Sequence, residues 1–265
     1  MFSHYRTLGF FLKKENRGEA DQLLTIFTKD FGKLKVLGRA IRKVKSKLRA
    51  GAELFLLSEI EFIQGKTYKT LTDTILIDKY NGIRKSVEKM DCAYQIMDAV
   101  DSLMIAREQD ENIWKLLNET FQKLDNQKTG SLPPWSRFQR DYSGKNSLRT
   151  IYYFFLWNFF SVLGYEVELY SCVICQKKLR PEVFWFLPNQ GGIVCSKCFK
   201  SIKKEENEEV KKINISTAKV LRIIIDGNWN ILKRLKTKEE DKRNLKEISY
   251  LYLSFLKKEF SKRGI

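Results

Sequence analysis

Apolar and polar positions alternate with a period of two over residues 1 to about 80, a pattern that predicts β-strands. The clearest stretch is Lys33-Leu34-Lys35-Val36, in which both apolar side chains fall on one face and both lysines on the other. The same criterion predicts strands at Thr7–Lys13, Gln22–Thr28, Lys33–Val36, Ala52–Ile63 and Lys66–Ile77. Because no long helix separates most of these segments, we expect a small closed barrel, with the five-stranded OB-fold as the candidate.

Beyond Lys85 the apolar positions recur every three to four residues, which is typical of amphipathic helices. The segment Leu148–Leu163 is apolar nearly all round, as expected for the central helix of a bundle. Shorter helices are predicted at 217–225 and 228–235, and a last helix follows them. The fold class is therefore α+β and multidomain: an OB-fold barrel at 1–82 and an α-helical domain at 83–265, interrupted by a small module at 170–200.

That module holds four cysteines in two closely spaced pairs, Cys172-x-x-Cys175 and Cys195-x-x-Cys198, with 19 residues between the pairs. Two thiolates so spaced can turn inward on one tight loop, and two such loops offer the four soft ligands that a structural Zn²⁺ takes. Apolar segments at 182–187 and 192–194 flank Pro188–Gly192 and predict a hairpin that brings the pairs together. Two disulfides or four unrelated buried thiols are the alternatives. A closed four-sulfur site has no open position for substrate, so the zinc would be structural.

The formal net charge is +17, from 49 basic and 32 acidic residues, and an excess of this size attracts polyanions. Eight cations and no acid occupy the segment from Lys33 to Arg49, which would link the third and fourth strands. Uncompensated like charges repel one another, so we expect phosphate as their counter-charge and a nucleic acid as the partner. The predicted DNA-binding residues are Lys33, Lys35, Arg39, Arg42, Lys43, Lys45, Lys47 and Arg49. A merely solvated loop is the alternative.

Aromatic side chains of the barrel could stack on bases, although such residues more often form the core. The candidates are Tyr5, Phe10, Phe11, Phe27, Phe31 and Tyr68. The fifth cysteine, Cys92, shares a helical face with Ile96 and Val100 and is interpreted as a core residue. No catalytic site is predicted, because the single histidine is His4 and the sequence has neither a phosphate-binding glycine loop nor a carboxylate cluster.

The start of the chain has no segment like a signal peptide, and no apolar run spans a bilayer comfortably. Few cysteines remain for disulfides, which favours a reducing compartment. We therefore expect a cytoplasmic protein with no membrane partner.

The order of several motifs resembles the bacterial recombination mediator family RecO. The resemblance begins with Asp21-x-Leu23-Leu24-x-x-Phe27-Thr28-x-x-x-Gly32-Lys33-Leu34 and continues with Gly38-x-x-x-Arg42-x-x-Lys45-Ser46 and Gly51. It extends to Leu156–Tyr165, which leads into the first cysteine pair, and so covers most of the chain. One departure is Gln176, since family members commonly have glycine directly after the first pair.

The resemblance implies an OB-fold, a helical domain and a zinc-binding insertion. It also implies binding to single- and double-stranded DNA, annealing of complementary strands and partnership with RecR. Further implied partners are the C-terminal tail of single-strand-binding protein, for which a groove near Phe154, Phe155 and Trp157 is our hypothesis, and functional links to RecA and RecF. Two other classes stay open from the residues: an RNA- or ribosome-associated zinc-ribbon/OB protein, and a zinc-stabilised nuclease.

Overall fold

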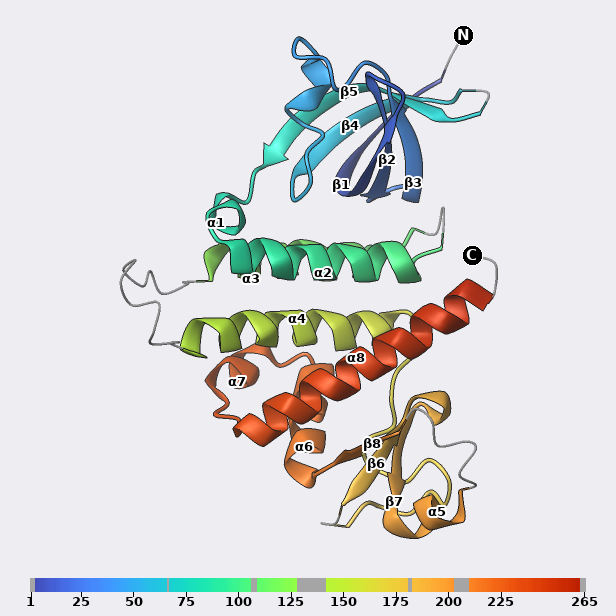
Figure 1. Cartoon of the computed structure of the whole chain (residues 1–265), viewed down its shortest axis with the longest axis vertical. Coiled ribbons are helices and arrows are strands. Elements are labelled where there is room, and N and C mark those ends of the chain that lie inside the picture. The colour runs from blue at the N-terminus through green and yellow to red at the C-terminus, as the bar shows by residue number, and fades with distance from the viewer. Residues whose placement is uncertain are drawn as a thin grey trace. The chain divides into compact units, whose positions relative to one another are not determined.

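The chain forms two compact units, residues 1–148 and 149–264. The computed structural model describes residues 3–65, 67–105, 109–127, 142–180, 183–202 and 210–262, and Figure 1 traces their elements. The first unit includes the barrel and the helices that directly follow it, since Phe10 of the barrel packs against Trp114.

The first unit contains a closed five-stranded barrel. Its strands are β1 (His4–Arg17), β2 (Asp21–Thr28), β3 (Gly32–Gly38), β4 (Leu57–Ile63) and β5 (Lys69–Asp78). They pair in the order β1-β2-β3-β5-β4, with β4 returning to β1 and with one parallel pairing, between β3 and β5. This arrangement confirms the predicted OB-fold barrel.

The fourth strand is shorter than predicted. Alternation suggested a start at Ala52, whereas β4 begins at Leu57. Phe55 has a φ of 64°, a left-handed conformation that cannot continue an extended strand. Residues 39–56 are therefore a connecting loop, which contains the short 3-10 helix η1 (Lys47–Arg49).

Three helices cover one end of the barrel (Figure 1): α1 (Asn81–Arg84), α2 (Val87–Leu103) and α3 (Glu111–Asn126). Phe10 and Phe27 belong to strands but contact the ring of Trp114 in α3, with centroids 5.3 and 6.0 Å away. Burial of such aromatic surface stabilises the helices on the barrel. Cys92 of α2 is buried, as its helical position predicts.

The second unit is built on α4 (Tyr142–Val162), which begins in the first unit, with α6 (Ile215–Ile225), α7 (Trp229–Arg234) and α8 (Glu239–Lys262). Trp157 of α4 is almost fully buried, and its indole Nε1 donates to Ser249 Oγ of α8 at 2.8 Å. Its ring also stacks on Tyr252 at 5.5 Å. The apolar helix predicted at 148–163 is therefore the centre of this helical packing.

A small cysteine module follows α4, formed by β6 (Phe184–Leu187), the 3-10 helix η3 (Pro188–Gln190), β7 (Gly192–Cys195) and α5 (Ser196–Ser201). The predicted hairpin is present, with Phe184 opposite Cys195. A third strand, β8 (Lys211–Ile213), pairs with β6 and completes a sheet in the order β7-β6-β8. The sequence analysis does not predict this strand.

In the part of the chain that the structure describes, no helix combines the length and the apolar character needed to cross a bilayer.

Candidate metal centre and basic loop

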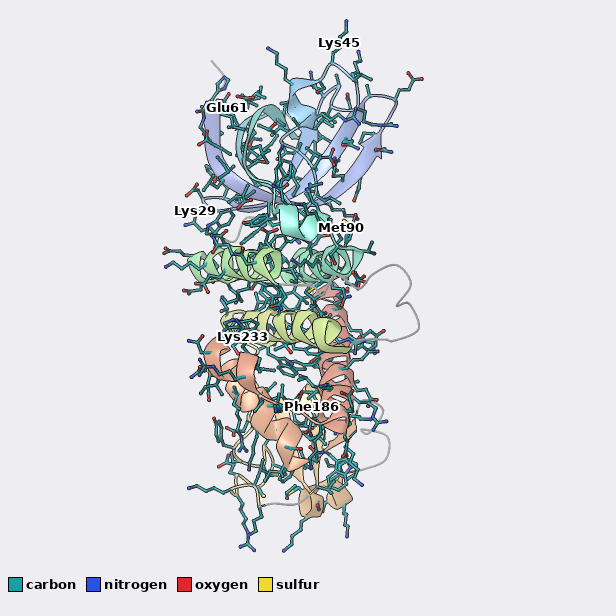
Figure 2. The ribbon with its side chains drawn as sticks, turned by 90° about the vertical axis from the view of Figure 1, so that its left-hand side faces the viewer. Lys29, Lys45, Glu61, Met90, Phe186 and Lys233 are labelled. Atoms are coloured by element: carbon teal, nitrogen blue, oxygen red, sulfur yellow. The ribbon has the colours of Figure 1, made fainter. Side chains whose placement is uncertain are left out.

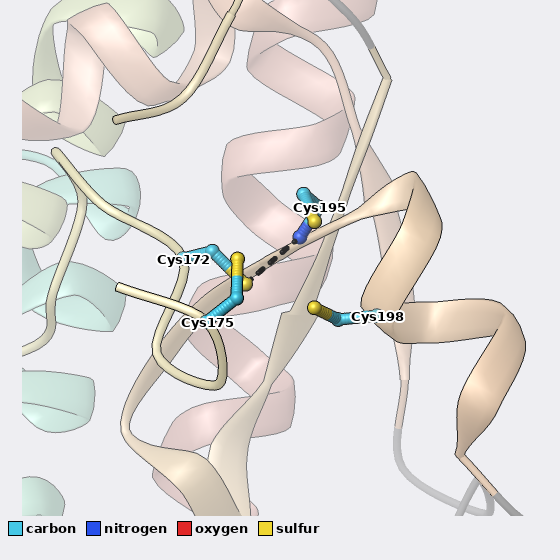
Figure 3. Close-up of side chains that lie close together, drawn as sticks. All are labelled: Cys172, Cys175, Cys195 and Cys198. Carbon is cyan, nitrogen blue, oxygen red and sulfur yellow. Dashed lines mark hydrogen bonds between the residues drawn. The ribbon is translucent and has the colours of Figure 1, made fainter. Parts of the chain in front are cut away.

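The four predicted ligands converge in the cysteine module (Figure 3). The Sγ atoms of Cys172, Cys175, Cys195 and Cys198 all lie within 4.8 Å of one another. Tetrahedral zinc with bonds of about 2.3 Å places its sulfurs about 3.8 Å apart, so a small contraction would complete the site. All four cysteines are free thiols in the structure. Among the described residues, no other group of histidine, cysteine or carboxylate side chains has this potential to hold an ion.

The backbone around the first pair fixes its loop. The N–H of Gln176 donates to the carbonyl of Cys172 at 2.8 Å, and the N–H of Val173 donates to the carbonyl of Ile193 at 3.0 Å. The second bond ties this loop to β7, the strand that ends at Cys195. A side chain at Gly192 would meet the backbone oxygen of Glu168 at 2.6 Å, so only glycine permits this close approach.

Two side chains outside the cysteine pairs stabilise the start of the cysteine module: Glu168, which precedes it, and Arg222 of α6. The Glu168 carboxylate accepts from the backbone N–H groups of Tyr170 (2.6 Å) and Ser171 (2.9 Å), and these bonds, chiefly that from Ser171, lower the pKa of Glu168. From α6, Arg222 donates its Nε to the carbonyl of Leu169 at 3.1 Å and lies over the Tyr170 ring at 4.4 Å. Glu168 therefore stabilises the turn that precedes the first cysteine pair.

The electrostatics of the cluster favour a cation. Burial opposes ionisation of Cys172, but backbone N–H groups, including that of Cys195 at 3.4 Å, outweigh it and lower the pKa of this thiol to about 6. For Cys198, burial and then the three neighbouring thiols raise the pKa to about 12. Four thiolates so close together repel one another unless a positive ion sits between them. The donor set therefore fits Zn²⁺ or a similar thiophilic metal.

The basic loop, which we define as residues 39–49, lies between β3 and β4 as predicted. Figure 2 shows Lys45 extending from the end of the barrel opposite to Lys29 and Met90. The loop is anchored by apolar contacts: Ile41 is buried in the barrel core and Leu48 packs against that core. Its ends are held by polar bonds, because Ala40 N donates to Asp21 Oδ1 at 2.7 Å and Thr74 Oγ1 donates to the Leu48 carbonyl at 3.1 Å.

The loop cations point into solvent without acidic partners. Six of the eight predicted DNA-binding residues lie in the loop and are exposed: Arg39, Arg42, Lys43, Lys45, Lys47 and Arg49. None of the ion pairs found among the described residues involves them. Arg42 donates to the Gly18 carbonyl at 3.2 Å, a bond that leaves its charge uncompensated.

The two remaining predicted residues lie on β3 and differ from each other. Lys35 is exposed. Lys33 instead directs its ammonium onto the C-terminal end of α2, where Nζ lies 2.6 Å from the carbonyl oxygen of Asp101 and 3.6 Å from its Oδ1. Lys33 therefore helps to join the barrel to α2.

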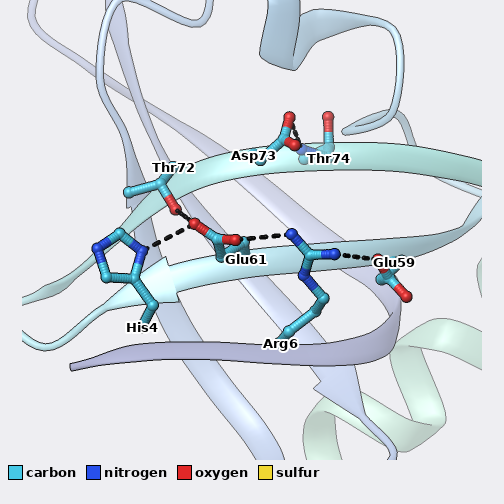
Figure 4. A network of polar contacts seen from close by, with 7 residues as sticks. All are labelled: His4, Arg6, Glu59, Glu61, Thr72, Asp73 and Thr74. Carbon is cyan, nitrogen blue, oxygen red and sulfur yellow. Dashed lines mark hydrogen bonds and ion pairs between the residues drawn. The ribbon is translucent and has the colours of Figure 1, made fainter.

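On the face of the barrel formed by β1 and β4, the charge of Arg6 is compensated within the protein. Arg6 of β1 pairs with Glu59 at 3.3 Å and with Glu61 at 2.9 Å, and His4 Nδ1 lies 2.8 Å from Glu61 (Figure 4). Hydrogen bonds to Glu61, first from Arg6 and then from His4 and Thr72, lower the pKa of its carboxyl to about 2. Unpaired cations are thus characteristic of the loop rather than of this face.

The predicted stacking and groove residues divide by burial. Phe10, Phe11 and Phe27 are fully buried and cannot stack on a base, whereas Tyr5 and Tyr68 are 37% and 40% exposed. On α4, Phe154, Phe155 and Trp157 are all buried in the second unit, so these side chains do not line an open groove.

The sequence interpretation also missed a second group of cations, on the cysteine module. Five basic residues there are exposed and take part in no ion pair found among the described residues. They are Lys177, Lys178, Arg180, Lys197 and Lys200. Their spacing is irregular in sequence, and the fold of the two cysteine loops places them on one module.

Comparison with known families identifies the same regions. The family model described as "Recombination protein O N terminal" matches residues 1–80, and "Recombination protein O C terminal" matches residues 138–258. The chain belongs to the RecO family. A DNA repair protein RecO from Dehalococcoides mccartyi is 28% identical over 237 residues, which cover 89% of this chain and 84% of that protein. The DNA repair protein RecO from Acetivibrio thermocellus is 27% identical over 252 residues, with 95% and 91% covered.

RecO membership supports a role in DNA repair and recombination and confirms the family resemblance drawn from the motifs. The matched N-terminal region coincides with the barrel that carries the basic loop, and the matched C-terminal region includes all four cysteines.

Proposed function

We propose that this protein is a recombination mediator that binds single- and double-stranded DNA without sequence preference and anneals complementary strands. The observation that carries the proposal is the basic loop: six exposed cations without acidic partners on a loop anchored to a rigid barrel. Phosphates would supply the missing counter-charge, and contacts to phosphates carry no sequence information.

Annealing needs a second surface, because two polyanions must be held close together while their repulsion is screened. The exposed cations of the cysteine module would supply it. A zinc ion with four thiolates carries a formal charge of about −2, which five cations more than neutralise. In this proposal the metal is Zn²⁺, it shapes the module and it takes no part in a reaction, so the protein is not an enzyme.

The family supports the remaining partners. With RecR, the protein would help to load RecA onto single strands covered by single-strand-binding protein, whose C-terminal tail it would contact, in a pathway linked to RecF. In this proposal the protein acts in the bacterial cytoplasm, at the nucleoid. It rests on RecO membership rather than on a surface seen in the structure.

A charge-reversal experiment tests the DNA-binding surface. The variant Arg39→Glu/Lys43→Glu/Lys45→Glu spares Arg42, whose guanidinium helps to hold the loop. We expect loss of binding to labelled oligonucleotides in fluorescence anisotropy and loss of strand annealing, with an unchanged thermal unfolding curve. The matched control is Lys29→Glu/Lys79→Glu/Lys85→Glu, which makes the same charge change at exposed positions outside the loop. Equal losses in both variants, or none in the first, would reject the loop as the DNA-binding surface.

A second candidate function, an RNA- or ribosome-associated protein, would use the same cations. Competition between single-stranded DNA and structured RNA separates the two, since recognition of 2′-hydroxyls would favour RNA. We expect the DNA to compete at least as well.

A further inference from the structure

Two adjoining cavities open on the barrel, outside the basic loop. The first has a volume of about 330 Å³ and is lined by Tyr5, Phe31 and Phe62, together with the polar residues Asp30, Gln64 and Lys69. The second, about 300 Å³, shares Gln64 and Lys69 with it and is also lined by Lys35 and Tyr68. Both volumes are at the lower end of the range for ligand pockets. Three aromatic rings thus lie around the first cavity, whereas Lys33, Lys35 and Lys69 lie around the second.

The aromatic cavity contains a fixed stack with one exposed member. Tyr5 of β1 lies opposite Phe62 of β4 in the strand register, and their rings stack with centroids 5.4 Å apart at 20°. Phe31 contacts both rings edge-on, at 5.6 and 5.5 Å. Phe62 is 1% exposed, whereas Tyr5 is 37% exposed. The strands hold Tyr5 rigidly while part of its side chain stays open to solvent, which is the property of a base-stacking platform.

The two cavities share Lys69 but differ in their other charges. Asp30 places a carboxylate in the aromatic cavity, where its Oδ2 accepts from Thr7 Oγ1 at 2.6 Å, and this negative charge disfavours an anion there. In the second cavity Lys35 is exposed, and Lys69 contacts Gln64 Oε1 at 2.9 Å. An anion therefore fits the second cavity and an uncharged polar ring fits the first.

We propose that the paired cavities bind one unstacked nucleotide of single-stranded DNA, with its base on Tyr5 and its phosphate beside Lys35 and Lys69. The inference rests on the proposed DNA-binding function and adds a contact that the basic loop cannot make. A nucleotide carries an aromatic base with polar edges and, a short distance away, a negatively charged phosphate. The base would fit the first cavity and the phosphate the second. Lys35 lies on β3, the strand that leads into the basic loop, so a bound strand could continue towards Arg39.

Oligothymidylate and an abasic oligonucleotide of equal length separate base binding from phosphate binding. The wild-type protein should bind oligothymidylate about tenfold more tightly than the abasic strand, because stacking on an aromatic side chain contributes on this scale. Tyr5→Leu keeps an apolar cover over Phe62 and should reduce the preference to about twofold or less, with abasic binding unchanged. Tyr250→Ser, at a tyrosine that is 74% exposed and lines neither cavity, is the control and should keep the full preference.

Each other outcome counts against the proposal in a distinguishable way. Equal binding of both strands by the wild-type protein, or a full preference in Tyr5→Leu, would overturn the nucleotide pocket and leave phosphate binding by the loop intact. Binding of neither strand in dilute buffer would overturn the proposed function and the pocket together. Competition by an acidic peptide ending in phenylalanine, lost in Tyr5→Leu while oligothymidylate binding persists, would assign the cavities to a peptide instead.

Discussion

Gln176 closes the first cysteine loop by donating its backbone N–H to the carbonyl of Cys172 at 2.8 Å, and it does so with a φ of 57°. This left-handed conformation is easy for glycine and costs other residues about 1–2 kcal/mol. The glutamine at this position therefore leaves the four cysteine ligands in place but puts strain in the turn that follows Cys175.

Gln176→Gly should stabilise the cysteine module by about 0.5–1 kcal/mol, because relief of the left-handed strain exceeds the extra entropy of glycine in the unfolded chain. Slower loss of metal to a chelator and greater amide protection over residues 172–180 would measure the gain. Lys177→Gly is the matched control, since Lys177 is not among the described residues with positive φ. There the same substitution should be neutral or destabilising. An equal gain in stability from both substitutions would contradict the inference that Gln176 is strained.

Cys172→Ser should abolish stoichiometric zinc binding and unfold the cysteine module. Cys172 is the most buried of the four ligands, and structural zinc contributes on the order of 10 kcal/mol of binding free energy to folding. Metal analysis of the purified protein and hydrogen exchange across residues 172–198 would report the two effects. Cys92→Ala removes a buried thiol from α2, outside the module, and should keep a full equivalent of zinc. Undiminished zinc in Cys172→Ser would rule out the four-thiolate site.

The barrel and the metal cluster could be predicted because their signals are local. Alternation over β3 reflects one buried and one exposed face, and Cys172 and Cys175 lie within a single turn of chain. Strand β8 could not be predicted in this way. It has three residues, and it forms because β6 offers an edge for pairing, a relationship that no short window of sequence contains.

Long-range contacts also determine which charges are paired and how far the first unit extends, and a short window of sequence contains neither. The sequence places Lys33 among eight similar cations, but its partner Asp101 is distant in sequence and meets it only when α2 docks on the barrel. The sequence likewise predicts Phe10 as a residue of the barrel. In the structure its ring also packs against Trp114 of α3, so the first compact unit includes α3. Exposed cations such as Lys177 and Lys197 come together on the cysteine module only after folding.

In the variant Glu61→Gln, the stability of the protein should decrease less as the pH falls into the acid range. Hydrogen bonds, first from Arg6, lower the pKa of Glu61 to about 2 in the folded protein, below the value of about 4.3 expected for an unfolded chain. A lowered folded pKa contributes stability that is present above about pH 4.3 and is lost as the pH falls towards 2. Thermal unfolding across this window should therefore show a shallower decline of Tm in the variant. Glu19→Gln, at an exposed carboxylate outside the ion pairs of the described residues, should follow the wild-type curve. Parallel curves for all three proteins would contradict the assignment.

Removing positive charges from the basic loop should change the salt dependence of DNA binding by an amount that follows from the number of charges removed. Each phosphate contact on single-stranded DNA contributes about −0.7 to the slope of log K against log salt concentration, because the contact releases condensed counterions. Arg39→Gln/Lys43→Gln/Lys45→Gln removes three of the unpaired charges and should make the slope shallower by about 2. Fluorescence anisotropy titrations with oligothymidylate at several salt concentrations would measure it. Lys29→Gln/Lys79→Gln/Lys85→Gln removes the same net charge outside the loop and should leave the slope within about 0.7 of the wild-type value. If the two variants shift the slope equally, the whole-protein charge and not the loop carries the binding.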